Sequence, residues 1–323
     1  MVFLYSSDRN YAKLSMISIS SLLENNQDAD SIKIYYINNN IGKDYQEQLS
    51  NLVHGFNRDI VYVDASLIDT SFITKTWFSV SGYYRVLITE IIQEPKIIYL
   101  DCDTVINGSF KKLWELELND YLFGGVKDTV QNFVATAVGQ KNNSYYINSG
   151  FLYINLEKCR RICFDKQVRE YFDKFNGLIP HHDQGIVNAI GFNKILYLSP
   201  KYNLTSQYLN YSVRQLCRLF DIACLYEQKE VDEAILSPVV IHYLNYNYGR
   251  PWEKGCKHPY LGLFNQFKQK YNIDIVLKDS GDSKGTKFRK LIYRNCPFLI
   301  HLWIEKTLDI TRKYRFSKTF NKL

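Results

Sequence analysis

Two aspartates separated by one residue follow an apolar run in the stretch IIYLDCDTVIN, which spans residues 97–107. Carboxylates are almost never buried without a partner, so Asp101 and Asp103 are expected to hold something. If the strand breaks into a turn between them, both side chains can converge on one cation. Carboxylate oxygens suit Mg²⁺ or Mn²⁺ and leave room for phosphate oxygens and water. A metal ion in that position would neutralise a pyrophosphate and help it to leave.

Two kinds of active site fit this motif. One is a nucleotide-sugar glycosyltransferase, in which the pair would hold a metal ion on the diphosphate. The other is a haloacid-dehalogenase-type phosphatase, in which DCDTV would supply Asp101 as nucleophile and Asp103 as general acid. Phosphatase motifs of that type usually follow the first strand, whereas three strand-like segments come first here, and the downstream acidic candidate SGDS (280–283) is weak. We favour the transferase and keep the phosphatase, together with a non-catalytic nucleotide-sugar-binding protein, as alternatives.

The elements that must position these carboxylates alternate in the first half of the chain. Residue patterns predict strands at 2–5, 32–37, 60–64 and 96–101, and helices at 10–26, 43–53 and 82–92. This alternation indicates an α/β fold with a parallel sheet that is covered by helices on both faces. Ligands bind such sheets beyond the carboxyl ends of the strands. Asp8 and Asn10 follow the first strand, so we expect them at the same edge as Asp101 and Asp103.

The second half of the chain is more mixed. We predict strands at 121–126, 150–156 and 237–244, helices at 157–175, 182–191 and 258–271, and a polar, Gly/Ser-rich linker at 277–287. These elements suggest a catalytic domain over residues 1–275 and an extension over residues 276–323.

The extension concentrates the basic charge. From residue 284 onward, 11 Lys and Arg stand against Glu305 and Asp309, a net charge of +9; the whole chain carries +7, so residues 1–283 sum to 7 − 9 = −2. An apolar helical face would comprise Leu299, Ile300, Leu302, Trp303 and Ile304. Such a helix suits an anionic membrane surface, but it could equally pack on the catalytic domain. We expect no nucleic-acid partner, because no recognition motif accompanies the charge.

Composition also bears on the compartment and the ligand. The seven cysteines form no CxxC pair, and we infer a reducing environment. The N-terminus lacks the charged and apolar regions of a signal peptide, and no apolar run is long enough to span a bilayer. We therefore expect a cytoplasmic protein, held at the inner face of the membrane if the extension binds lipid. The 26 Tyr, 19 Phe and 4 Trp suit a sugar site, because aromatic rings offer apolar faces.

Six segments in order carry a family resemblance: SSDRNYAKLSMISISSLLEN, YYRVLI, IIYLDCDTVI, YINSGFLYINLEK, HHDQGIVNAI and IHYLNYNYGRPW. Together they resemble the retaining glycosyltransferases of family 8 over about residues 1–270. The resemblance implies a GT-A fold, with a Rossmann-like mixed central sheet and helices on both faces. It also implies a UDP-galactose or UDP-glucose donor and a glycan acceptor on a lipid, a polysaccharide or a protein.

The resemblance assigns roles at the nucleotide and the metal. The uracil and ribose would lie against the loop after the first strand, which contains Ser6, Ser7, Asp8, Asn10 and Tyr11. The alternative is that Asp8 or Asn10 merely caps the following helix. His242, in VVIHYL, would be the third metal ligand beside Asp101 and Asp103, and an imidazole favours Mn²⁺ over Mg²⁺. Alone, His242 would more often be a satisfied core histidine.

The donor's diphosphate and hexose receive further expected contacts. Arg85 would reach the diphosphate and the sugar, and Cys102 lies between the two metal ligands. The hexose would be contacted by Asp128, Asn148, Ser149 and Gly150.

Asp183 and Gln184 match the family's pair near the anomeric carbon and are the expected catalytic residues. An amide is a poor nucleophile, so Gln184 better suits stabilising an oxocarbenium-like transition state while the acceptor attacks on the face that UDP leaves. A covalent glycosyl-enzyme remains the alternative route.

The segment YGRPWEK resembles a family loop that folds over the diphosphate. Arg250 stands where the family usually has Lys, and Gly249 is the nearest candidate for its glycine contact. The chain departs from the pattern, however, because it carries two additional residues between His242 and Pro251. This loop could close differently, or its tyrosines could stack on sugar.

Overall fold

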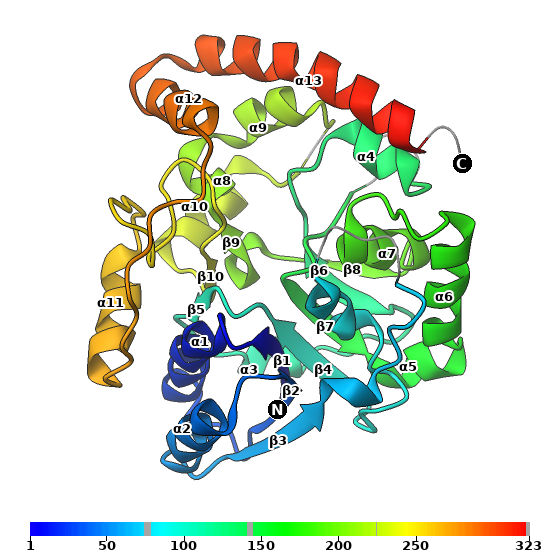
Figure 1. The fold of residues 1–323 in the computed structure, drawn as a ribbon, viewed down its shortest axis with the longest axis vertical. Coiled ribbons are helices and arrows are strands. Elements are labelled where there is room, and N and C mark those ends of the chain that lie inside the picture. Colours follow the sequence, from blue (N-terminus) through cyan, green and yellow to red (C-terminus); the bar gives the residue numbers. More distant parts are fainter. Residues whose placement is uncertain (74–78, 141–144, 224, 321–323) are drawn as a thin grey trace.

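The computed structural model describes residues 1–73, 79–140, 145–223 and 225–320. Within these residues a seven-stranded central sheet has the order β3-β2-β1-β4-β7-β6-β8 (Figure 1). Its strands are β1 (Val2–Asp8), β2 (Lys33–Asn39), β3 (Asp59–Asp64), β4 (Lys96–Leu100), β6 (Phe123–Val126), β7 (Phe151–Asn155) and β8 (Ile195–Leu198).

The central sheet is mixed. Strands β3, β2, β1 and β4 run parallel, which confirms the alternating pattern of the first half of the chain. Strand β7 is antiparallel to both of its neighbours, β4 and β6, and β8 is again parallel to β6. The purely parallel sheet indicated by the alternation is therefore limited to the first four strands, and the mixed sheet implied by the resemblance is confirmed.

Helices cover both faces of the sheet. One face packs against α1 (Ala12–Glu24), α2 (Lys43–His54) and α11 (Leu261–Lys270). The other packs against the 3₁₀ helix η2 (Val80–Val86), α5 (Leu156–Arg161), α6 (Phe164–Lys174) and α7 (His182–Ile190) (Figure 1). Alternate residues of each strand serve the two cores: in β1, Phe3 and Tyr5 pack on the first side and Leu4 on the second.

A second, three-stranded sheet lies beside the end of β4. It has the order β5-β10-β9, with β5 (Thr104–Ile106), β10 (Val240–His242) and β9 (Leu204–Thr205). The chain leaves the central sheet after Leu100, turns, and enters the small sheet at Thr104. The expected break between Asp101 and Asp103 is therefore present.

Two predicted helices differ from the structure. Residues 82–92 do not form an α-helix: the 3₁₀ helix η2 ends at Val86 and turns follow, because Gly82 and several β-branched residues favour the α-helix poorly. The predicted helix 157–175 is two helices, α5 and α6. They are separated at Cys163, whose φ of 53° lies in the left-handed region that ends helices.

The remaining helices surround the small sheet and the top of the molecule. They are α3 (Lys111–Trp114), α4 (Asn132–Ala137), α8 (Ser206–Asn210), α9 (Val213–Phe220), α10 (Gln228–Leu236), α12 (Lys284–Asn295) and α13 (Phe298–Phe320). Helix α12 begins inside the predicted linker, where the Ser283 hydroxyl accepts a hydrogen bond from the Thr286 amide.

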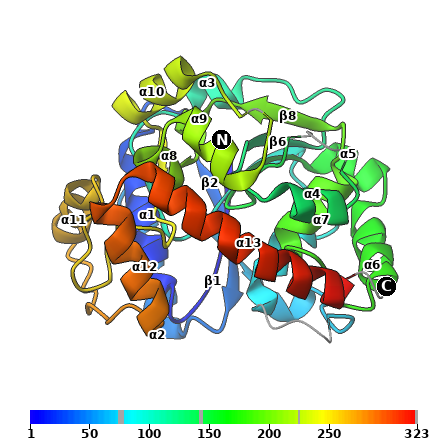
Figure 2. The same ribbon diagram turned by 90° about the horizontal axis from the view of Figure 1, so that it is seen from above.

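The C-terminal helix α13 crosses the molecule from α12 to α4 (Figure 2). It packs against the catalytic fold at both ends, through Phe298 on Tyr211 and Phe316 on Phe133. Within the part of the chain that the structure describes, no helix combines the length and apolar character needed to cross a bilayer. The boundary at residue 275 stays a prediction.

Candidate active site

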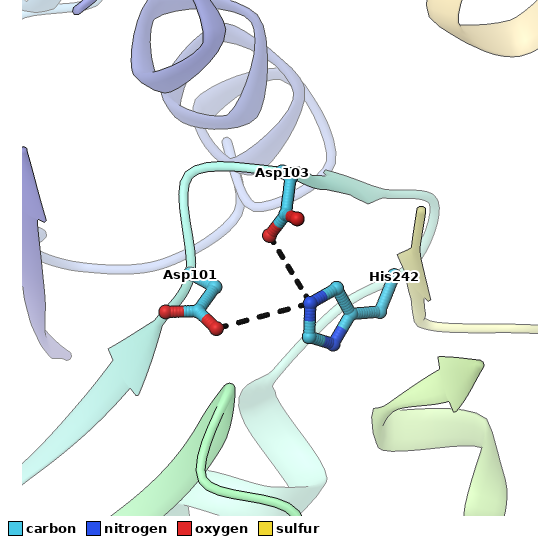
Figure 3. A group of neighbouring side chains, drawn as sticks. All are labelled: Asp101, Asp103 and His242. Carbon is cyan, nitrogen blue, oxygen red and sulfur yellow. Dashed lines mark hydrogen bonds and ion pairs between the residues drawn. The ribbon is translucent and has the colours of Figure 1, made fainter. Parts of the chain in front are cut away.

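Three side chains predicted as metal ligands lie together at the junction of the two sheets (Figure 3). One ligand atom each of Asp101, Asp103 and His242 lies within 4.8 Å of the others. The His242 Nε2 atom is 3.1 Å from Asp103 Oδ1 and 3.8 Å from Asp101 Oδ2. His242 is almost fully buried, whereas the Asp101 and Asp103 side chains are 24% and 13% exposed, so a ligand can reach the carboxylates from solvent.

Strand pairing produces this convergence. His242 lies opposite Thr104 in the antiparallel ladder of β10 and β5, which places it beside the turn that carries both aspartates. The Thr104 hydroxyl donates a hydrogen bond to the Asp101 carbonyl oxygen at 2.7 Å and closes that turn.

Gly150 makes room for the cluster. The Asp101 amide donates to the Gly150 carbonyl at 2.9 Å, so the two backbones lie side by side. A Cβ atom at position 150 would lie 2.3 Å from His242 Cε1 and 2.6 Å from Asp101 Oδ2, which are impossible contacts. The absence of a side chain here is therefore a steric requirement for the close approach of His242 and Asp101.

Hydrogen bonds orient the His242 ring for metal binding. Its Nδ1 lies 3.0 Å from Asn203 Oδ1, and Asn203 Nδ2 donates to Asn148 Oδ1 at 2.9 Å. An Nδ1–H that donates to Asn203 leaves the Nε2 lone pair directed at the two carboxylates, as a metal ligand requires. Two carboxylates and one imidazole are a donor set that fits Mn²⁺.

The same arrangement shifts the pKa values of the ligands. Burial alone would lower the pKa of His242, but the charge and hydrogen bond of Asp103 outweigh it and the pKa is raised. Burial would raise the pKa of Asp103, yet His242 and Arg250 hold that pKa below its ordinary value. The negative charge of the two carboxylates beside His242 therefore favours a cation at this place.

Arg85 faces inward, beside the metal ligands. Its guanidinium lies 3.0 Å from Asp101 Oδ1 and 3.4 Å from Asp183 Oδ2, and donates to the Ser149 carbonyl at 2.9 Å. It also lies over the Tyr99 ring, 4.3 Å from the ring centroid. A buried guanidinium needs an anionic partner, and Asp101 and Asp183 provide it.

Gln184 is held at both ends of its amide. Its Nε2 donates to Asp128 Oδ2 at 2.8 Å, and its Oε1 accepts from the Ser149 amide at 3.2 Å. Asn148 Nδ2 donates to the same Asp128 oxygen at 3.0 Å. The residues expected around the hexose therefore form one hydrogen-bonded group.

A cavity of about 310 Å³ extends from the loop after β1 to Asp101 and Asp103. It is lined by Ser6, Ser7, Asp8, Tyr11, Ser79, Ser81, Gly82, Arg85, Tyr99, Asp101, Cys102 and Asp103. Asn10 instead lines an adjacent cavity of about 410 Å³, together with Trp252. Asp8 Oδ1 accepts from the amides of Asn10 and Tyr11, which lie in the turn before α1. Tyr11 is the N-cap residue of α1 and no side chain caps that helix, so the capping alternative is not borne out.

The loop after β10 carries Arg250. The positive charge of Arg250 contributes to lowering the pKa of Asp103. Gly249 has a φ of +73°, which favours glycine, and the Arg250 amide donates to Glu253 at 3.0 Å. The Arg250 Nε is buried and makes no hydrogen bond among the described residues.

Two residues of the site, Tyr99 and Asn203, were not predicted from the sequence. The Tyr99 hydroxyl donates to Asp101 at 2.6 Å, and its position two residues earlier on the same strand was a usable signal. Asn203 links His242 to Asn148, and nothing in the local sequence indicated that role.

Comparison with known proteins decides the family. The family model "Glycosyl transferase family 8" matches residues 2–256. The chain belongs to glycosyltransferase family 8. This chain is 26% identical over 265 residues to general stress protein A of Bacillus subtilis, and the match covers 79% of this chain and 88% of that protein. It is 30% identical over 209 residues to the lipopolysaccharide 1,2-glucosyltransferase of Escherichia coli, covering 61% and 60%.

Solved structures agree on the fold of the family 8 chain. The galactosyltransferase LgtC, crystallised with donor and acceptor sugar analogs, superimposes with a TM-score of 0.67 at 20% identity, covering 88% of this chain and all of that one. The glycosyltransferase GlyE of Streptococcus pneumoniae gives 0.61 at 18% identity, covering 86% and 65%. The GT-A fold is confirmed, and the chain is a glycosyltransferase by family. The phosphatase alternative is wrong, and Asp101 follows the fourth strand of the chain, not the first.

The steric role of Gly150 gives a first prediction. Gly150→Ala should weaken Mn²⁺ binding by about 10–100-fold, because the added methyl group must displace His242 or Asp101. Isothermal titration calorimetry measures the Mn²⁺ affinity of the variant and of the wild type. Gly262→Ala is the matched control, since a Cβ at position 262 meets no atom within 4 Å. Unchanged affinity in Gly150→Ala would contradict the geometry.

The raised pKa of His242 gives a pH prediction. A metal ion and a proton compete for Nε2, so Mn²⁺ affinity should be flat above the His242 pKa and fall about tenfold per pH unit below it. Because that pKa is raised, the break should lie above the ordinary value of 6.5. Titrations of Mn²⁺ between mildly acidic and alkaline pH locate the break. A break below 6.5 would show that His242 is not held by Asp103 as described.

Proposed function

We propose that this protein is a retaining, Mn²⁺-dependent hexosyltransferase that uses UDP-galactose or UDP-glucose and transfers the hexose to a glycan on a lipid, a polysaccharide or a protein. The observation that carries the proposal is the cluster of Asp101, Asp103 and His242 at the end of the cavity that begins at the Ser6–Tyr11 loop. A nucleoside diphosphate laid along this cavity would bring its phosphates to the cluster.

The donor's nucleotide would be held by the loop after β1, with Ser6, Ser7 and Asp8 as hydrogen-bonding partners and Tyr11 as an aromatic face. Asn10 would contribute from the adjacent cavity. A divalent ion on Asp101, Asp103 and His242 would offset the charge of the leaving diphosphate.

Arginines would complete the diphosphate site. Arg250 has an unsatisfied buried Nε, and its planar donors suit phosphate oxygens. Arg85 is already paired with Asp101 and Asp183, so its main contribution would be to hold those carboxylates in place. Gly249 would permit the turn that directs Arg250, and Cys102 would line the floor of the cavity.

The hexose would lie against Asp128, Asn148, Ser149 and Gln184. Because Asp128 and Ser149 hold both ends of the Gln184 amide, its oxygen is already an acceptor and is poorly placed to become a nucleophile. Burial raises the pKa of Asp183, although the Arg85 charge opposes the rise. The contact with the Arg85 guanidinium, at 3.4 Å, holds the Asp183 carboxylate in place. We therefore favour attack of the acceptor on the face that UDP leaves, and a trapped adduct on Gln184 would overturn this preference.

The extension supports a proposal of peripheral contact with an anionic membrane. Although one side of α13 packs on the fold, its other side exposes Leu299, Trp303, Ile310 and Tyr314, and α12 exposes Phe288. Exposed basic residues accompany them: Lys284, Lys287, Lys313, Arg315 and Lys318. Aromatic and aliphatic side chains among basic ones are the composition that binds anionic lipid surfaces.

Donor hydrolysis tests the function. UDP release from UDP-galactose or UDP-glucose should require Mn²⁺ and should fall by about 100-fold in Asp103→Asn, because a metal ligand is lost. Asp120→Asn is the control, since the Asp120 side chain is fully exposed. A panel of UDP-sugars identifies the hexose. Binding of UDP-sugar without turnover would instead support the non-catalytic alternative.

Liposome sedimentation tests the membrane contact. Replacing Trp303 and Ile310 together by Ser should reduce partitioning onto anionic liposomes by at least about tenfold, because two exposed apolar anchors are lost. Leu236→Ser removes an equally exposed side chain from α10 and should change nothing. Hydrolysis of UDP-sugar should be the same in all three proteins. Equal partitioning of the double variant and the wild type would exclude α13 as the anchor.

A further inference from the structure

A second cavity, of about 360 Å³, lies between α4, α9 and the C-terminal helix pair. Its wall includes Thr129 after β6, His181 before α7, Tyr246 in the loop after β10, and Glu305 and Arg312 of α13. It shares no lining residue with the nucleotide cavity. Its volume is within the range of small-molecule sites.

Two residues that line this cavity, Thr129 and His181, lie beside residues proposed to hold the hexose. Thr129 directly follows Asp128, which accepts a hydrogen bond from Gln184. The His181 Nδ1 lies 3.5 Å from Gln184 Nε2 and 2.9 Å from the Tyr146 hydroxyl. A ligand in the cavity would therefore lie next to the residues proposed to hold the donor's hexose.

Helix α13, which we call the strap, lines the cavity through Glu305 and Arg312. It runs across the molecule from α12 to α4 (Figure 2). At one end the His301 Nδ1 lies 3.2 Å from the Tyr211 hydroxyl, and at the other Phe316 packs edge-on against Phe133 of α4. Between these ends Asp309 accepts from Gln131 at 3.2 Å. The strap is thus fixed on both sides of the opening.

The inner side of the strap carries a network of opposite charges. Arg312 donates to Glu305 at 2.7 Å and to Asp309 at 3.0 Å, and the Tyr293 hydroxyl of α12 donates to Glu305. Arg289 of α12 lies 3.7 Å from Glu305. The wall therefore offers donors and acceptors together without a large excess of one charge.

Unused polar atoms point to a polar ligand. Thr129 is 6% exposed, and its hydroxyl makes no hydrogen bond among the described residues. The Gln131 Oε1 atom is also buried and without a hydrogen-bond partner there, although the Gln131 residue is only partly buried. Buried polar atoms of this kind cost free energy unless a ligand or water satisfies them. Both residues line the cavity.

The remaining wall is aromatic and aliphatic, with Phe133, Phe220 and Tyr246 among its residues. Aromatic faces beside paired carboxylate and guanidinium groups suit a neutral polyhydroxylated ring, which has both apolar C–H faces and hydroxyl groups. A strongly charged ligand would have to break the Glu305–Arg312 pair.

We infer that this cavity is a saccharide subsite for the acceptor, and that Glu305 and Arg312 of the C-terminal strap are specificity-determining residues there. The inference rests on the proposed hexosyl transfer. On this inference the inner side of α13 contacts the acceptor, while the outer side carries the apolar residues proposed to contact lipid. The inference also accounts for the lengthened loop after His242, whose Tyr246 reaches the cavity wall.

The test compares Thr129→Val, Glu305→Gln and Arg312→Gln with the control Arg315→Gln, an exposed position on the same helix. Binding of methyl glycosides of glucose, galactose and N-acetylglucosamine is followed by saturation-transfer NMR, and transfer to each from the UDP-sugar is assayed. We expect at least one probe to bind the wild type and the control, and each of the three variants to bind it about tenfold more weakly. Donor hydrolysis without acceptor should stay within twofold of wild type.

Thr129→Val leaves the α13 network intact, so it keeps the test valid if a charge variant unfolds. The inference is overturned if no probe binds the wild-type protein, or if the folded variants bind as the control does. Failure of the proposed function is a separate result: the probes would still bind in the strap-dependent way while UDP-sugar hydrolysis was absent from the wild type.

Discussion

The site depends on the close approach of three backbone segments around Gly150. The turn at Asp101–Asp103, the end of β10 at His242 and the start of β7 all meet there, and the space between them does not admit one methyl group. The two sheets meet at this corner because the chain passes from β4 of the central sheet to β5 of the small sheet through only three residues. The metal cluster is therefore a property of the sheet junction, not of any single element.

From this corner one hydrogen-bonded path leads to the proposed sugar site. His242 is linked through Asn203 to Asn148, and Asn148 shares Asp128 with Gln184. A shift of the imidazole would be transmitted to the side chains around the hexose. Arg85 forms a second link, since it contacts both Asp101 and Asp183. Buried polar networks of this kind hold a geometry when all their members are satisfied.

The sequence predicted those features that are local. Apolar runs separated by helical patterns located β1 to β4, and the acidic pair at the end of β4 located the edge where ligands bind. The family resemblance added His242 and the residues around Gln184, which local patterns could not connect. Tertiary contacts account for what was not predicted: the 3₁₀ helix at Val80–Val86, the left-handed Cys163, and the roles of Gly150 and Asn203. The placement of α13 was open because its predicted apolar face suits either a membrane or the catalytic domain. In the structure that face is divided, since Leu302 packs against the core while Leu299 and Trp303 are exposed.

The most direct measurement is a crystal structure with Mn²⁺ and a non-hydrolysable UDP-hexose, recorded near the manganese absorption edge. The account predicts a single anomalous peak in contact with Asp101, Asp103, His242 Nε2 and oxygens of the diphosphate. Manganese bound elsewhere, or a diphosphate bound with no metal ion between it and these side chains, would contradict the account.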